Sequence, residues 1–133
     1  MLTVAQVEQL IQSNEQQARI VFLLISQIRA EPAWEPGVEP DPVRLTGEDA
    51  FQRFEGSVDR MNTSVSRFRL HSAMMETYEE AENAQDVLRE MDKVQTETAT
   101  GLLEMKNSLL TLLNSLLLQR GEPAFELISP NAN

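Results

Sequence analysis

The stretch AEPAWEPGVEPDPV, residues 30–43, holds four of the six prolines of this 133-residue chain, and no other proline precedes Pro123. Proline fixes φ, lacks a backbone N–H and restricts the residue before it. We therefore predict an extended polyproline II strap over residues 32–45, long enough at ~3.1 Å per residue to run back along a helix. Trp34 and Val38 are expected to pin this strap to a helical surface. A mobile acidic linker is the alternative.

The block before the prolines, residues 1–31, is predicted to form one helix. Thr3 and Gln6 have the spacing of a capping box, in which a hydroxyl and an amide satisfy free backbone N–H groups. Apolar residues follow at alternating steps of three and four, which places them on one seam. The seam comprises Val4, Val7, Ile11, Asn14, Ala18, Val21, Ile25 and Ile28. Asn14 is its one polar member. A buried Asn in such a seam can fix register and partner number, and the alternative is that Asn14 faces solvent at a frayed edge.

The block after the prolines, residues 46–120, keeps a seven-residue apolar pattern with two weak points. Residues 76–83 break the register, and residues 96–101 combine β-branched side chains with glycine, which lowers helix propensity. The block is therefore either one helix of roughly 110 Å or a hairpin that turns at one of these points. In both cases the fold class is all-α, with long amphipathic helices in a coiled-coil-like bundle or an extended helical hairpin.

The end of this block is rich in leucine, and residues 107–119 carry no charge. Such a helix has little solvent-facing surface, and leucines on two adjacent stripes require two packing partners. Self-association is the simplest source of the second partner. The tail, residues 121–133, is expected to be extended and to pack on a neighbouring surface or subunit, with a loose terminus as the alternative. The residues predicted to form the interface are Leu109, Leu110, Leu113, Leu116, Leu117, Trp34 and Phe125.

The chain is acidic, with a net charge of −10 that is unevenly distributed. Four arginines and two acids give residues 51–75 a net charge of +2, whereas two bases and eight acids give residues 76–100 a net charge of −6. If the chain turns within residues 76–83, we expect the arginine-bearing face to lie against the acidic one. If it does not turn, the same charges can pair between subunits, and the further alternative is that both faces are only solvated. The acidic face predicted near this turn comprises Glu76, Glu79, Glu80, Glu82 and Asp86.

The residue inventory argues against most catalytic chemistry. Without cysteine, and with His71 as the only histidine, the chain can form neither a thiolate nucleophile nor a multi-histidine metal site. Its carboxylates lack the spacing of a di-iron or calcium site, and its five glycines are isolated rather than gathered in a phosphate-binding loop. We therefore expect no enzymatic activity, no cofactor and no metal.

Charge and hydropathy also bear on partners and location. An acidic chain opposes a phosphate backbone, so direct nucleic-acid binding is not expected. The first residues lack a basic region, and the apolar stretches fall short of the ~20 residues of a spanning helix, so we expect neither a signal peptide nor a membrane span. The predicted location is the cytoplasm or the interior of an assembled particle.

The function predicted from these features is that of a non-enzymatic structural or adaptor subunit. It would self-associate through leucine-rich helices and join other protein subunits in a larger bacterial or phage assembly. The alternative is an acidic helical chaperone or inhibitor that occupies a basic surface of a partner protein, such as a nucleic-acid-binding surface.

Overall fold

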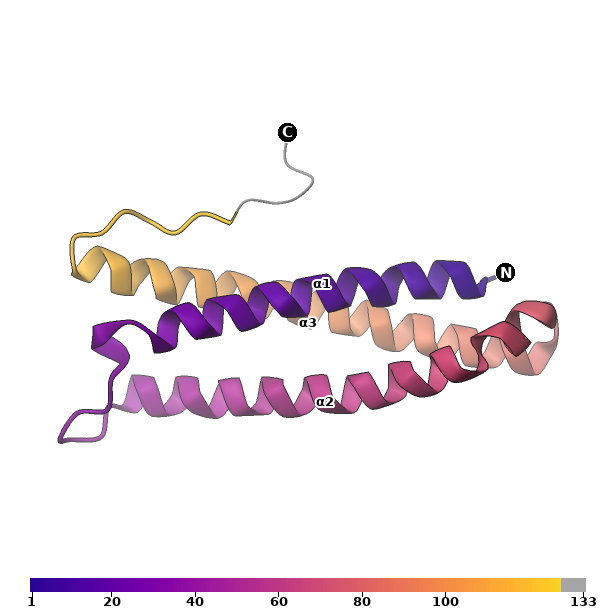
Figure 1. Ribbon diagram of the computed structural model, residues 1–133, viewed down its shortest axis with the longest axis horizontal. Coiled ribbons are helices and arrows are strands. Elements are labelled where there is room, and N and C mark those ends of the chain that lie inside the picture. The colour runs from indigo at the N-terminus through magenta and orange to yellow at the C-terminus, as the bar shows by residue number, and fades with distance from the viewer. Residues whose placement is uncertain (128–133) are drawn as a thin grey trace.

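The computed structural model describes residues 1–127, which form three long α-helices and no strand. α1 spans Val4–Arg29, α2 spans Pro42–Thr77 and α3 spans Glu82–Gln119, and a short 3-10 helix, η1, spans Pro32–Trp34. α1 and α3 run parallel to each other and antiparallel to α2 (Figure 1). None of the described helices is long and apolar enough to cross a lipid bilayer. The described chain is thus an all-α helical bundle, which confirms the all-α part of the predicted fold class.

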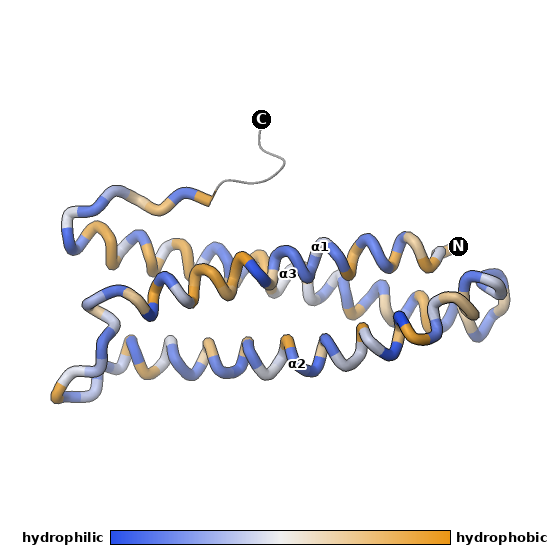
Figure 2. The backbone as a smooth tube through the Cα atoms, viewed as in Figure 1, coloured by the Kyte–Doolittle hydropathy of each residue, from blue (hydrophilic) through white to orange (hydrophobic). Residues whose placement is uncertain are grey.

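α1 begins at the predicted capping box. The Thr3 hydroxyl oxygen accepts a hydrogen bond from the Gln6 backbone N–H at 3.1 Å, and the Gln6 side-chain oxygen accepts one from the Thr3 N–H at 3.0 Å. Seven of the eight predicted seam residues are buried, and Ala18 is half-buried. The apolar part of α1 lies at the same end of the bundle as the leucine-rich end of α3 (Figure 2). The seam is therefore the surface through which α1 joins the bundle.

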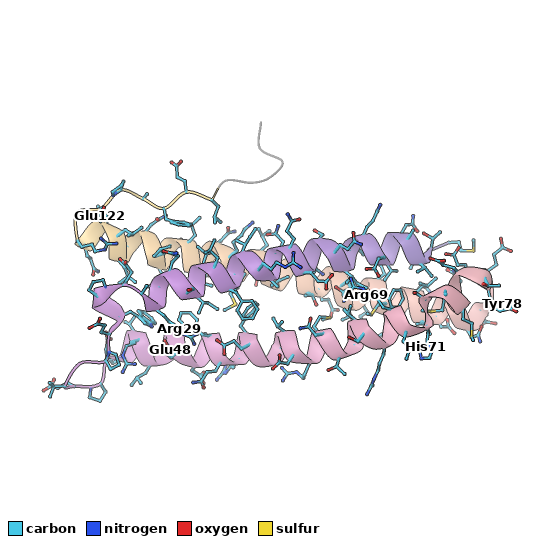
Figure 3. All side chains as sticks on the ribbon, viewed as in Figure 1. Arg29, Glu48, Arg69, His71, Tyr78 and Glu122 are labelled. Atoms are coloured by element: carbon cyan, nitrogen blue, oxygen red, sulfur yellow. The ribbon has the colours of Figure 1, made fainter. Side chains whose placement is uncertain are left out.

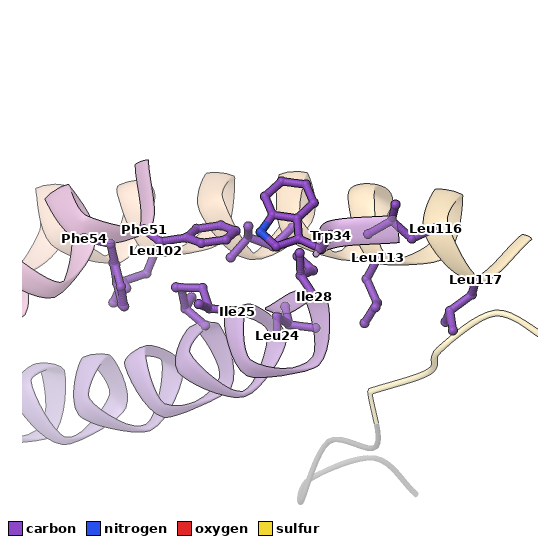
Figure 4. Close-up of a cluster of buried hydrophobic side chains, with 12 residues drawn as sticks. Leu24, Ile25, Ile28, Trp34, Phe51, Phe54, Leu102, Leu113, Leu116 and Leu117 are labelled. Carbon is purple, nitrogen blue, oxygen red and sulfur yellow. The ribbon is translucent and has the colours of Figure 1, made fainter. Parts of the chain in front are cut away.

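The core consists of two apolar clusters, one toward each end of the bundle. The larger lies where α1 ends and α2 begins (Figure 4), and the smaller lies near the start of α1 and the α2–α3 turn. The larger comprises Val21, Leu24, Ile25, Ile28, Trp34, Phe51, Phe54, Leu102, Leu109, Leu113, Leu116 and Leu117. The smaller comprises Val4, Val7, Ile11, Val65, Phe68, Leu88 and Met91.

The structure corrects the predicted strap. Pro32–Trp34 form η1 and Pro42 is the first residue of α2, so only residues 35–41 connect the two helices. Proline at a helix start costs no hydrogen bond, because the first N–H groups of a helix have no partner within it, and Asp41 caps α2. Pro32 and Pro42 therefore begin helices, whereas Pro36 and Pro40 lie in the short connection between them. Val38, expected to be a second anchor, is fully exposed.

The second helical block folds back on itself. α2 ends at Thr77 and α3 begins at Glu82, so the chain turns within residues 76–83 and forms a hairpin instead of one continuous helix. α3 runs through residues 96–101 without a break. Leu102, directly after this weak segment, is buried in the larger cluster. Tertiary packing therefore outweighs the low local helix propensity there.

The tail leaves α3 at Gly121, whose φ of +74° suits glycine and ends the helix. It then runs back along the bundle (Figure 1). The Phe125 N–H donates a hydrogen bond to the Asn114 side-chain oxygen at 2.7 Å, and Phe125 and Leu127 pack half-buried against the larger cluster. The first part of the predicted tail is thus bound to its own chain, while residues 128–133, including Ile128, lie outside the described residues.

Candidate interaction surface between α2 and α3

α2 is the least buried of the three helices. α1 packs closely along α3, whereas α2 approaches the other two more loosely. Only four of its 36 residues are buried, compared with ten of 38 in α3. The four are Phe51, Phe54, Val65 and Phe68. Part of the apolar seam of α2 therefore has no helix packed against it.

A cavity of about 570 Å³ lies between α2 and the α1–α3 pair. Its lining on α2 runs from Ala50 to Val65, which corresponds to about 22 Å of helix. The walls are mostly apolar, with small residues such as Ser57 and Gly101 on the two facing helices.

A second hollow, of about 920 Å³, lies between α2 and α3 toward the turn that joins them. Phe68 and Met91 contribute buried surface to it, whereas Met74, Tyr78 and Val87 stand along its walls with 68%, 64% and 49% of their surface exposed. We call the two hollows together the α2–α3 groove. Large apolar side chains that gather along a hollow are typical of an interaction surface.

A buried polar layer forms part of the wall of the first cavity. The Asn14 side-chain amide donates hydrogen bonds of 2.8 Å to both the backbone and the side-chain oxygen of Gln95, which is fully buried. The Gln95 amide in turn lies 3.0 Å from the sulfur of Met61 on α2. Buried polar groups need such partners, and here the two side chains supply them to each other. Asn14 is thus buried in the seam with Gln95 as its partner, and a role in fixing the register of the helices stays a prediction.

Trp34 anchors the connection between α1 and α2. Its indole N–H donates to Glu48 at 2.9 Å, and its ring lies 5.8 Å from the ring of Phe51 (Figure 4). Arg29 also donates to Glu48, at 3.0 Å (Figure 3), and its hydrogen bond is the main cause of a lowered Glu48 pKa, with a further contribution from Trp34. A Cβ on Gly47 would lie only 2.6 Å from the indole. Glycine is therefore needed here for the ring to lie on α2.

All seven predicted interface residues pack into or against the larger cluster of their own chain, and their assignment to a subunit interface stays a prediction. They are Leu109, Leu110, Leu113, Leu116 and Leu117 on α3, Trp34 in η1 and Phe125 in the tail. These residues pack within their own chain because α1 lies parallel beside the leucine-rich end of α3 and the tail runs back along the bundle. These two segments supply the packing partners that the sequence pattern requires. Leu103 and Leu118 on α3 stay exposed.

The arginine-bearing block pairs with α1, not with the acidic block. Arg69 lies 2.6 Å from Glu8 and 2.7 Å from Glu15, and these hydrogen bonds raise the pKa of Arg69 and lower that of Glu15 (Figure 3). Among the described residues, no ion pair joins residues 51–75 to residues 76–100. The expected charge pairing across the hairpin is therefore wrong for the isolated chain, because α2 stands away from α3.

One residue of the predicted acidic face, Glu79, makes a contact that holds the fold together. Glu79 is half-buried, and its carboxylate accepts the Val4 backbone N–H at 3.0 Å, which satisfies a free donor at the start of α1. The remaining members are exposed. They are Glu76, Glu80, Glu82 and Asp86, of which Asp86 pairs with Arg89.

Sequence reasoning missed the residues that fasten both ends of α1 to α3. At one end, buried Gln85 donates to the Leu2 carbonyl at 2.8 Å. At the other, buried Glu31 accepts hydrogen bonds of 2.8 and 3.0 Å from Arg120. Each partner lies more than 80 residues away along the chain, so no local pattern points to the pair.

No family model, curated protein or solved structure matches the chain. Within residues 1–127, no three His, Asp or Glu side chains come together as a metal site requires, and His71 is an exposed residue on the α2 wall of the groove. The α2–α3 groove is therefore the feature from which a function is argued.

Proposed function

We propose that this chain is a non-enzymatic structural or adaptor subunit that self-associates through its helices in a larger protein assembly. The observation that carries the proposal is the α2–α3 groove, which extends along most of α2 and has apolar walls. Apolar surface left in water is unfavourable by ~25 cal/mol per Å², so a partner that covers the groove gains free energy. A helical bundle with one uncovered side is suited to this kind of association.

The proposed contact surface differs from the leucine-rich end of α3. Met74 and Tyr78 on α2 and Val87 on α3 are exposed, so they can meet a partner without unfolding the chain. The buried leucines would have to leave the core first. The groove thus offers association at no cost to the fold of the monomer.

Size-exclusion chromatography with light scattering, at several protein and salt concentrations, tests the proposal. We expect an oligomer whose mass rises with protein concentration. Met74→Glu, inside the groove, should dissociate it, whereas Leu70→Glu should not, because Leu70 is equally exposed on α2 but does not line the groove. Circular dichroism should show the same helical content in both variants.

Two outcomes contradict the proposal. A wild-type chain that is monomeric at every concentration would refute self-association. If that monomer instead binds a basic protein at low salt, the exposed acids near the α2–α3 turn are the expected binding surface. The alternative of an acidic chaperone or inhibitor is then favoured. Unchanged mass for Met74→Glu would move the interface away from the groove.

A further inference from the structure

Two rows of opposite charge border the α2–α3 groove. Within each row the residues recur every seven positions, so they share one face of their helix and drift by only ~20° per repeat. The arginine row on α2 is Arg53, Arg60 and Arg67, and the glutamate row on α3 is Glu90, Glu97 and Glu104. Arg67 and Glu90 both line the hollow near the turn, and Arg53 lines the cavity. Three of the six residues thus line the groove, and the seven-residue spacing places Arg60, Glu97 and Glu104 on the same helix faces as those three.

The two rows are matched level by level along the bundle. The contact between Met61 and Gln95 marks residues of α2 and α3 that lie at the same level. Because the helices are antiparallel, a step forward on α2 corresponds to a step back on α3. Counted from this contact, Arg60 lies level with residue 96, and each arginine falls within one residue, about 1.5 Å, of the level of one glutamate.

The rows do not pair with each other inside the described chain. Arg53 pairs with Asp49 on its own helix at 2.8 Å, and Arg60 donates to Ser57 at 3.2 Å. Within residues 1–127, no ion pair links the arginine row to the glutamate row, and all six side chains are exposed. Both rows are thus accessible to an incoming surface.

We propose that a second copy of the chain covers the groove, related to the first by a twofold axis that runs along the bundle. The inference rests on the proposed self-association and specifies its geometry. Such a rotation places α2 of each copy over α3 of the other and keeps every residue at its level along the axis. The arginine row of each copy then meets the glutamate row of the other. A twofold axis across the bundle would instead place arginine over arginine, which is unfavourable.

The size of the face agrees with a dimer. From Ala50 to the end of α2 at Thr77 the groove follows about 40 Å of helix, and two helices side by side are about 20 Å wide, so each copy offers roughly 800 Å². A standard stable interface needs ~800 Å² per partner. The apolar walls supply the burial, and the charged rows select the orientation, since exposed ion pairs contribute little to affinity.

The first test reverses the charge of each row. One variant carries Arg53→Glu, Arg60→Glu and Arg67→Glu, and a second carries Glu90→Lys, Glu97→Lys and Glu104→Lys. Each should weaken dimerisation at low salt by about tenfold or more, with a smaller loss near 1 M salt, where the Debye length is ~3 Å. The variant Arg19→Glu, which reverses an exposed charge on α1 that lines neither hollow, is the control and should dimerise normally.

Recombination of the two variants separates pairing between copies from pairing within one chain. All six reversals in one chain should restore the homodimer, and an equimolar mixture of the two variants should give a heterodimer. If the rows paired within one chain, the mixture would give no heterodimer, and this result would overturn the inference. Circular dichroism on each variant establishes that the fold is retained.

The second test fixes the orientation without changing the charged rows, and it uses the absence of native cysteine. Met74→Cys and Asn83→Cys lie at matched levels on opposite rims, so a mixture of the two variants should form a disulfide-linked dimer on oxidation. Met74→Cys mixed with Asn107→Cys, at the far end of α3, should not. Cross-linking of Met74→Cys with itself would show α2 over α2 and would overturn the inference.

The two proposals fail in different ways. A wild-type chain that stays monomeric refutes self-association itself. An oligomer that tolerates both row reversals leaves self-association in place and refutes the twofold arrangement along the bundle.

Discussion

Replacement of Gly47 by alanine is a direct test of how Trp34 is held. In most helix interiors this change stabilises a protein by up to ~1 kcal/mol, because alanine has the higher helix propensity. At Gly47 the new methyl carbon would lie 2.6 and 2.7 Å from two carbon atoms of the indole ring. Trp34 is 5% exposed, its indole is hydrogen-bonded to Glu48 and its ring packs on Phe51, so the ring cannot rotate away without losing these contacts. The substitution must therefore displace the ring or the helix.

The expected effect has the opposite sign to the usual one. Overpacking costs ~1 to 3 kcal/mol, and loss of the hydrogen bond to the charged Glu48 costs a further ~1.5 to 3 kcal/mol. After subtraction of the ~1 kcal/mol that alanine contributes, Gly47→Ala should destabilise the chain by about 1.5 to 5 kcal/mol.

Urea unfolding, followed by circular dichroism and by tryptophan emission, measures this change in the free energy of unfolding. Trp34 is the only tryptophan of the chain, so the emission reports on its surroundings alone. Gly56→Ala on the same helix is the matched control, because its Cβ meets only the Arg60 guanidinium at an ordinary 3.6 Å. The control should gain up to ~1 kcal/mol. If both variants gained equally and the emission of Trp34 stayed unchanged in Gly47→Ala, the close packing of Trp34 on α2 would be refuted.

Three further predictions concern the core and the ion pairs. Asn14→Leu leaves the buried amide of Gln95 without its partner and should cost ~1 to 3 kcal/mol by urea unfolding, and the double variant with Gln95→Leu should recover much of that loss. Because Arg29 lowers the pKa of Glu48 in the folded state, the stabilisation is present above the unfolded value of ~4.3 and disappears as the pH falls through the folded value. Glu48→Gln should therefore be less stable than the wild type at pH 7, by a difference that shrinks below pH ~4 in acid-unfolding curves. Leu113→Ala should cost ~2 to 5 kcal/mol in thermal unfolding, whereas Leu118→Ala, at an exposed position, should stay within ~0.5 kcal/mol of the wild type.

Features that depend on a few neighbouring residues were accessible from the sequence. The start of α1 follows from Thr3 and Gln6, and its buried seam follows from the spacing of apolar residues, because capping and amphipathicity act within one or two turns. The start of α2 could not be predicted from the sequence, because Pro42 suits both polyproline II and the first turn of a helix. Proline restricts the backbone without choosing between these states.

Features that depend on distant partners needed the structure. Residues 76–83 break the apolar register and become the turn, whereas residues 96–101 have poor helix propensity and stay helical because Leu102 is buried against the bundle. The leucine pattern showed that α3 needs partners on two sides, but not that α1 and the tail of the same chain supply them. The heptad rows were visible as spacing, whereas their place along one groove required the packing of α2 and α3.

The parallel placement of α1 beside α3 has a consequence for how the chain is made. Asn14 cannot form its hydrogen bonds to Gln95 until the ribosome has added 81 further residues. At 5 to 20 residues per second this synthesis takes about 4 to 16 s. During that time the apolar seam of α1 has no α3 to cover it. A neighbouring nascent chain that has already made its α3 can accept this α1 in place of its own, since the two helices are identical. Translation of many copies from one message therefore favours exchange of α1 between chains, and slower translation between residues 30 and 95 should increase the exchanged fraction.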